Sequence, residues 1–165
     1  MLYFRNKKNI IKFNLMNKPL ISCLCPTKNK PSIVKDAIRC FNNQTYPNKE
    51  LILVTNEENP HLQFLKDSVC DNIKLIYAPV GTVLGELRNI SVDNASGEYV
   101  AIWDDDDIHH NDRLELQYNA LMRVKGKEAC FLQKVLFHDL NSGDKGILKT
   151  WWGNEASMLA LKSGM

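Results

Sequence analysis

The stretch YVAIWDDDD, residues 99–107, places four consecutive aspartates directly after an apolar run. The apolar residues suit a buried strand, whereas aspartate is a poor strand former and neighbouring carboxylates repel one another. Four carboxylates at the end of such a strand call for a counter-charge. Mg²⁺ and Mn²⁺ take oxygen ligands, and Mg²⁺ usually binds through one or two carboxylates plus substrate phosphates. The stretch therefore favours a metal–phosphate site over a solvated acidic turn that begins the next helix.

Strand and helix signals alternate around this stretch, which predicts an α/β domain with a largely parallel sheet. Apolar runs predict further strands at 20–25, 51–54, 73–78 and 129–136. Helical spacing predicts helices that begin near Pro31, Pro60, Thr82 and Leu114. We expect Thr82 to cap its helix, which would run to about Ala95, and Gly97 to lie just past the end of that helix.

Composition indicates one ordinary globular domain. The 165 residues are 44% hydrophobic and 24% charged, and a net charge of +2 gives no reason to expect a nucleic-acid partner. The five cysteines include no Cys-x-x-Cys pair, so reduced thiols in a cytoplasmic protein are expected. Residues 1–18 carry five basic side chains and no acid, and they predict a basic leader before a domain spanning 19–165. We do not expect this leader to be a signal peptide, but it could contact the inner face of a membrane peripherally.

Three segments are expected to meet at one edge of the predicted sheet. Residues 26–29 follow the first strand, residues 55–57 follow the second, and the aspartates follow the fourth. Ligands of open parallel sheets bind beyond the carboxyl ends of the strands. If the backbone stays extended, Asp104 and Asp106 share one face and Asp105 and Asp107 the other. The order of segments predicts a nucleotide site with its metal at the acidic edge.

Four blocks follow one another between Pro19 and Leu121. They are PLISCLCPTKNKP at 19–31, QTYP at 44–47 with ELILV at 50–54, LRN at 87–89 with ASGEY at 95–99, and WDDDDI at 103–108 with DRLE at 112–115. In this order they resemble the family 2 inverting glycosyltransferases, which have the GT-A fold. The last block matches the family's Asp-x-Asp metal motif and the helix behind it. The resemblance implies a mostly parallel sheet flanked by helices.

The resemblance also implies roles for individual residues. Asp106 would be the main ligand of Mn²⁺ or Mg²⁺, and Asp104 would face the ribose or the water shell of the metal. Arg88 would lie near the diphosphate or the aspartates, although a helix-surface residue paired with an acid is an equal alternative. The full set of expected substrate contacts is Pro26, Thr27, Asn29, Asn56, Arg88, Asp104 and Asp105.

Two departures from the family pattern stand out. The family usually has an acidic pair after the second strand, whereas this chain has VTNE at 54–57, so Asn56 would have to bind the base edge. In relatives a carboxylate on a later segment acts as general base, and no acid follows Glu155 here. We therefore expect a C-terminally incomplete domain, with the base unassigned and Glu155 as a weak candidate. His109 and His110 are interpreted as turn residues ahead of the next helix.

The resemblance implies metal-dependent, inverting transfer of a sugar from a nucleotide-diphosphate donor to a saccharide or other hydroxyl acceptor. Because the base is missing from its usual place, a non-catalytic nucleotide-sugar-binding remnant is an alternative. A nucleotidyltransferase is a third reading, since it would also use acidic metal ligands. It ranks last because residues 26–32 contain no glycine, and those enzymes usually carry a glycine-rich loop there.

Overall fold

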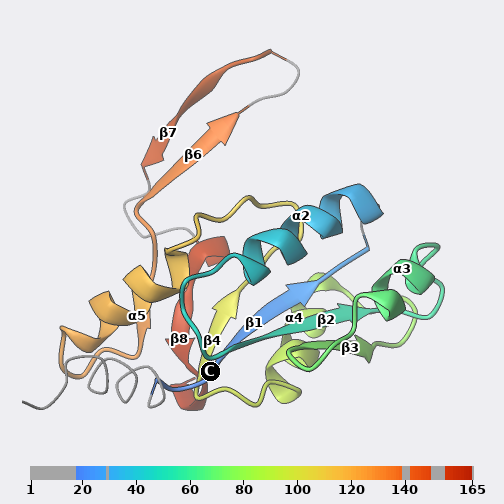
Figure 1. The fold of residues 1–165 in the computed structure, drawn as a ribbon, viewed down its shortest axis with the longest axis horizontal. Helices are drawn as coiled ribbons and strands as arrows, with labels where there is room; N and C mark the ends of the chain where they lie inside the picture. The colour runs from blue at the N-terminus through green and yellow to red at the C-terminus, as the bar shows by residue number, and fades with distance from the viewer. Residues whose placement is uncertain (1–17, 29, 139–141, 150–154, 165) are drawn as a thin grey trace, which may run out of the picture.

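The computed structural model describes residues 18–28, 30–138, 142–149 and 155–164 (Figure 1). Most of the basic leader and Asn29 lie outside these ranges. Within the ranges no helix is long and apolar enough to cross a membrane.

A six-stranded sheet in the order β3-β2-β1-β4-β8-β5 forms the centre of the molecule (Figure 1). The four neighbours β1 (Ile21–Pro26), β2 (Lys49–Thr55), β3 (Ile73–Tyr77) and β4 (Tyr99–Ile102) run parallel. The short β8 (Leu159–Leu161) runs antiparallel between β4 and β5 (Ala129–Cys130). The mostly parallel α/β sheet expected from the sequence is confirmed.

The strand expected at 129–136 is divided in two. Only β5 joins the central sheet, and the chain then forms a separate antiparallel hairpin of β6 (Lys134–His138) and β7 (Lys145–Lys149). This hairpin extends away from the body of the molecule in Figure 1.

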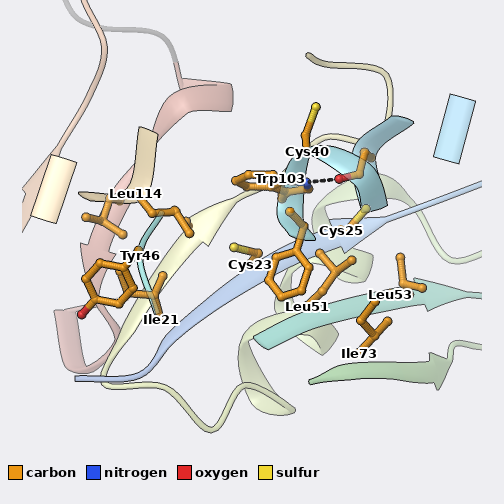
Figure 2. Close-up of a cluster of buried hydrophobic side chains, with 14 of the residues drawn as sticks. Ile21, Cys23, Cys25, Cys40, Tyr46, Leu51, Leu53, Ile73, Trp103 and Leu114 are labelled. Atoms are coloured by element: carbon orange, nitrogen blue, oxygen red, sulfur yellow. Dashed lines mark hydrogen bonds between the residues drawn. The ribbon is translucent and has the colours of Figure 1, made fainter. Parts of the chain in front are cut away.

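Alternating side chains of the central strands build one core on each face of the sheet. Residues such as Cys23 and Leu51 pack with α2 (Pro31–Asn42), α3 (Leu62–Asp67) and α5 (Arg113–Met122). Residues such as Leu24 and Ile52 pack with α4 (Leu84–Asp93) on the other face. Figure 2 shows the first core, in which the indole nitrogen of Trp103 donates to the carbonyl of Ala37 at 3.2 Å. Both faces are covered, which explains the continuous apolar runs in the sequence.

The order of the strands reverses between β1 and β4. The chain proceeds from β1 to β2 and β3, and α4 on the opposite face then returns it to the other side of β1. The amide of Trp103, just beyond β4, donates to the carbonyl of Leu24 at 2.9 Å. Such a reversal opens a crevice at the carboxyl ends of the two strands, where α/β proteins bind ligands.

The expected N-cap of α4 is wrong, whereas the expected end near Ala95 agrees with the observed C-cap at Asn94. The N-cap is Val83, because the Thr82 hydroxyl donates to the carbonyl of Pro79 at 2.6 Å instead of capping the helix. The helix ends at Asp93, so Gly97 is not its terminating residue. A Cβ at Gly97 would lie 2.6 Å from the carbonyl oxygen of Leu20. Close packing against the entry to β1 therefore accounts for this glycine.

Candidate active site

The four aspartates form a turn just beyond the carboxyl end of β4, next to the end of β1. The strand ends at Ile102, and the amide of Asp107 donates to the carbonyl of Asp104 at 3.3 Å. The two-faced alternation expected for an extended backbone is therefore wrong, because the chain turns at Asp105 and Asp106. Each carboxylate consequently has its own environment.

Asp105 points into the protein and joins the two strands. The residue is 7% exposed, and its carboxylate accepts a hydrogen bond from the hydroxyl of Thr27. The amide of Thr27 in turn donates to the carbonyl of Val54 at 2.8 Å. The structure thus brings together Thr27 and Asp105, both of which the sequence analysis assigned to the site, and fixes the turn to the end of β1.

Asp104 meets Arg88 of α4. The Nη2 atom of Arg88 lies 3.2 Å from Oδ1 and 3.3 Å from Oδ2 of Asp104. The buried Nε atom of the same guanidinium has no hydrogen-bond partner among the described residues. This contact fits both readings of Arg88, because the acid with which this helix residue pairs is one of the aspartates.

Asp106 is the exposed member of the turn and makes no hydrogen bond or ion pair within the part of the chain described. Asp107 is half-buried, and its pKa is raised by burial and then by the carboxylates of Asp104 and Asp106, while Arg113 opposes the shift. No group of three or more His, Cys, Asp or Glu side chains in the described ranges forms a metal cage. The donor set suits a cation that takes further ligands from phosphate and water.

Arg113 is a site residue that the sequence analysis missed. The residue is 4% exposed. Its guanidinium donates to the carbonyl of Ile102 at 2.8 Å, and its Cζ atom lies 5.1 Å from the ring centroid of Trp103. A basic residue in the first turn of a helix opposes the helix dipole. That mismatch at the start of α5 was the available signal that Arg113 has another role.

His109 lies between the aspartate turn and α5, as expected for a turn residue. Its ring packs on Trp103 with ring centroids 4.0 Å apart, and it lies 2.9 Å from Nη1 of Arg113. Burial, followed by the charge of Arg113, lowers the pKa of His109 to about 3. The imidazole is therefore neutral and able to accept a hydrogen bond from the guanidinium.

The remaining residues that the sequence analysis assigned to the site are Pro26, Asn29, Asn56 and Glu155. Pro26 is the buried last residue of β1, and Asn56 is half-buried immediately after β2. Asn29 lies outside the described residues, and the backbone of Glu155 begins the 3-10 turn η1 (Glu155–Ser157). The structure therefore unites Thr27, Arg88 and the aspartates, with Pro26 and Asn56 on the adjacent strand ends.

Comparison with known proteins identifies the family. Residues 22–151 match the family model "Glycosyl transferase family 2". An uncharacterized glycosyltransferase of Haemophilus influenzae is 32% identical over 111 residues, which are 66% of this chain and 44% of that protein. The UDP-Glc:alpha-D-GlcNAc-diphosphoundecaprenol beta-1,3-glucosyltransferase of Escherichia coli is 28% identical over 109 residues, 66% of this chain and 43% of that protein.

A solved structure shows the same fold. The mannosyltransferase of Pyrobaculum calidifontis, in complex with GDP-Man and Mn²⁺, superposes with a TM-score of 0.61 at 16% identity and covers 78% of this chain and 43% of its own. The chain thus spans less than half the length of these relatives. Its sheet and helices have the GT-A arrangement of glycosyltransferases. On the extent of the family match, the chain belongs to glycosyl transferase family 2.

Proposed function

We propose that this chain binds a nucleotide-diphosphate sugar in the crevice between β1 and β4 and takes part in metal-dependent, inverting sugar transfer. The anchored aspartate turn carries this proposal. Thr27 and Arg88 hold Asp105 and Asp104, while Asp106 stays open to solvent. Because contacts hold Asp105 and Asp104, the turn presents Asp106 at a defined position. The carboxylate of Asp106 remains open to solvent and can bind a ligand.

Each of these residues would have a separate role in donor binding. Asp106 would hold Mn²⁺ or Mg²⁺, and Asp104 would face the ribose or the water shell of the cation. When bound, the cation supplies Lewis-acid stabilisation to the departing diphosphate. Arg88 adds a fixed positive charge beside Asp104. The Mn²⁺ complex of the Pyrobaculum mannosyltransferase supports the choice of a divalent cation.

The nucleoside would lie along the strand ends. Pro26 and Thr27 border it from β1, with Asn29 next along the loop and Asn56 offering an amide to the base edge. Asp105 supports this contact through its hydrogen bond with Thr27. Asn56 stands where the family usually has an acid, so it would set the nucleotide preference.

The acceptor would be a saccharide or another hydroxyl compound, activated by a general base. Glu155 remains the candidate base within this chain. The Escherichia coli relative is named for a diphosphoundecaprenol-linked acceptor, which supports a site at a membrane surface. We accordingly propose a cytoplasmic catalytic domain at 19–165, with residues 1–18 in peripheral contact with the inner face of the membrane.

Calorimetry with a panel of nucleotide sugars, in Mn²⁺ and in EDTA, tests donor binding. We expect binding that depends on Mn²⁺, because the aspartate turn would otherwise repel the diphosphate. Asp106→Asn should weaken that binding more than the matched neighbour Asp107→Asn. Equal affinity in EDTA and in Mn²⁺ would overturn the metal role. Tight donor binding without any transfer to saccharide acceptors would instead support the non-catalytic alternative.

A further inference from the structure

Arg113 is a buried cation without a carboxylate partner in the described part of the chain. Its side chain makes no ion pair with any described acid. Taking a charge out of water is costly unless hydrogen bonds replace the lost hydration. Here the replacements are the carbonyls of Ile102 and Ala156, at 2.8 and 3.3 Å, and the side-chain oxygen of Gln117, at 3.1 Å.

These partners belong to separate parts of the site. Ile102 ends β4 directly before the aspartate turn, and His109, which also contacts the guanidinium, follows that turn. Ala156 lies in η1, 43 residues further along the chain than Arg113. One rigid guanidinium therefore connects both ends of the aspartate turn to η1.

Gln117 strengthens the same connection one helical turn later. Its amide donates to the carbonyl of Ser157 at 2.6 Å, while its oxygen accepts from Nε of Arg113. The hydroxyl of Ser157 accepts from the amide of Leu132 at 2.9 Å. Helix α5 thus holds η1 through two side chains, and Arg113 is the one that also contacts the end of β4.

The charge of Arg113 acts on the turn as well. Burial raises the pKa of Asp107, and the charge of Arg113 opposes that rise. Burial lowers the pKa of Arg113, and the carboxylates of Asp107 and Asp104 are among the groups that oppose that fall. Arg88 approaches Asp104 from α4, and Arg113 belongs to α5 on the opposite face of the sheet. Part of the counter-charge that four aspartates require is therefore built into the protein from both sides.

We propose that Arg113 is a positioning residue for sugar transfer. It holds the aspartate turn, which faces the donor, in a fixed relation to η1, which begins at Glu155. This inference deepens the proposed function and rests on it. Misplacement of reacting groups by 1 Å can cost about 100-fold in rate, so a clamp between the two segments has a large effect without touching substrate.

Three variants separate the effect of the hydrogen bonds of Arg113 from the effect of its charge. Arg113→Met removes the charge and the hydrogen bonds, and Arg113→Lys keeps the charge but loses the forked geometry. Arg123→Met removes a charge from the exposed C-cap of the same helix and is the matched control. Thermal unfolding first establishes that each variant is folded, and Arg113→Lys serves alone if the methionine variant is not.

The first readout is hydrogen exchange in the nucleotide-free protein. We expect faster exchange in both the 103–109 and the 155–158 segments of the Arg113 variants and no change in Arg123→Met. The second is affinity for a nucleoside diphosphate in Mn²⁺ relative to EDTA. Arg113→Met should lose at least about tenfold of the Mn²⁺-dependent gain, and Arg113→Lys should recover part of it.

The two measurements test different parts of the inference. Unchanged exchange in a folded Arg113 variant would overturn the clamp whatever the ligand data show. Faster exchange with wild-type Mn²⁺-dependent affinity would reduce Arg113 to a stabilising residue and also overturn the inference. Absence of Mn²⁺-dependent binding by the wild-type protein would overturn the proposed function, and exchange would still decide whether Arg113 links the two segments.

Discussion

Arg88 and Asp104 form an ion pair between the helix α4 and the end of β4, with Nη2 at 3.2 Å from Oδ1 and 3.3 Å from Oδ2. Both side chains are partly exposed, at 28% and 22%. Solvent screens such a pair, so its contribution to folding stability is small. Its larger effect is on orientation, because one nitrogen within reach of both oxygens restricts how the Asp104 carboxylate can rotate.

Arg88→Met should therefore weaken nucleotide binding more than it weakens the fold. We expect a several-fold lower affinity for a nucleoside diphosphate in Mn²⁺ and a change of less than about 1 kcal/mol in the free energy of unfolding. Calorimetry and chemical denaturation measure the two effects. Arg39→Met is the control, because Arg39 also pairs with an acid, Asp36 at 3.0 Å, but on α2 away from the turn. Equal losses of affinity in both variants would show that the Arg88 contact has no specific role.

Gly97→Ala should destabilise the protein strongly. The new Cβ would lie 2.6 Å from the carbonyl oxygen of Leu20, and 2.7 and 2.8 Å from Oγ and N of Ser22. Two of these atoms are backbone and cannot move aside, so we expect the upper end of overpacking costs, about 3 kcal/mol, in chemical denaturation.

Gly85→Ala is the matched control for that change. Apart from its chain neighbours and the backbone of its own helix, no described residue has a heavy atom within 4 Å of a Cβ at Gly85, which is inside α4. Alanine there should stabilise by up to about 1 kcal/mol because glycine is a poor helix former. A Gly97→Ala variant as stable as the wild type would mean that β1 and the segment before β4 are not packed this closely.

Local patterns in the sequence predicted most of the fold because the central strands are buried on both faces. Continuous apolar runs marked β1 to β4, and Pro31 marked the first position of α2. The N-cap of α4 was missed because a hydroxyl can bind either a helix amide or a nearby carbonyl, and Thr82 binds Pro79. Sequence alone does not decide that competition.

The site was predictable where side chains contact one another and not where they contact backbone. Asp104, Asp105 and Thr27 follow strand ends, so their meeting could be inferred from topology. Arg113 binds the carbonyls of Ile102 and Ala156, which any residue type could offer. No residue pattern records such partners, and only the folded backbone brings them to the guanidinium.

The thiols of the first strand should resist modification. Cys23 and Cys25 are fully buried on β1; burial raises the pKa of Cys23 to about 12 and that of Cys25 well above its ordinary value. Because the thiolate is the reactive form, both should label far more slowly than the exposed Cys70. Mass spectrometry after timed exposure of the native protein to a thiol reagent measures this. Cys70→Ser should abolish the fast phase, and rapid labelling of Cys23 or Cys25 would contradict the burial of β1.

Glu50 gives the protein an acid-sensitive contact far from the aspartates in sequence. The side chain of Glu50 is 7% exposed. Its carboxylate accepts hydrogen bonds from Ser22 Oγ and the Ser96 amide, both at 2.6 Å, and from Lys74 Nζ at 2.7 Å. Burial by itself would raise the pKa of Glu50, but the hydrogen bonds from these three groups outweigh it. The pKa is therefore lowered from the ordinary value of 4.5.

The sign of the resulting pH dependence follows from linkage. A lowered pKa in the folded state means that the unfolded chain binds the proton more readily, so the contribution of Glu50 is full above pH 4.5 and is lost as the pH falls through the folded value. We expect the difference in unfolding free energy between the wild type and Glu50→Gln to stay constant at neutral pH and to shrink below pH 4.5. Glu58→Gln, at an exposed position, should show no such difference. Chemical denaturation across this range measures both, and a wild-type advantage that stays flat or grows as the pH falls below 4.5 would show that Glu50 is not held as a buried carboxylate.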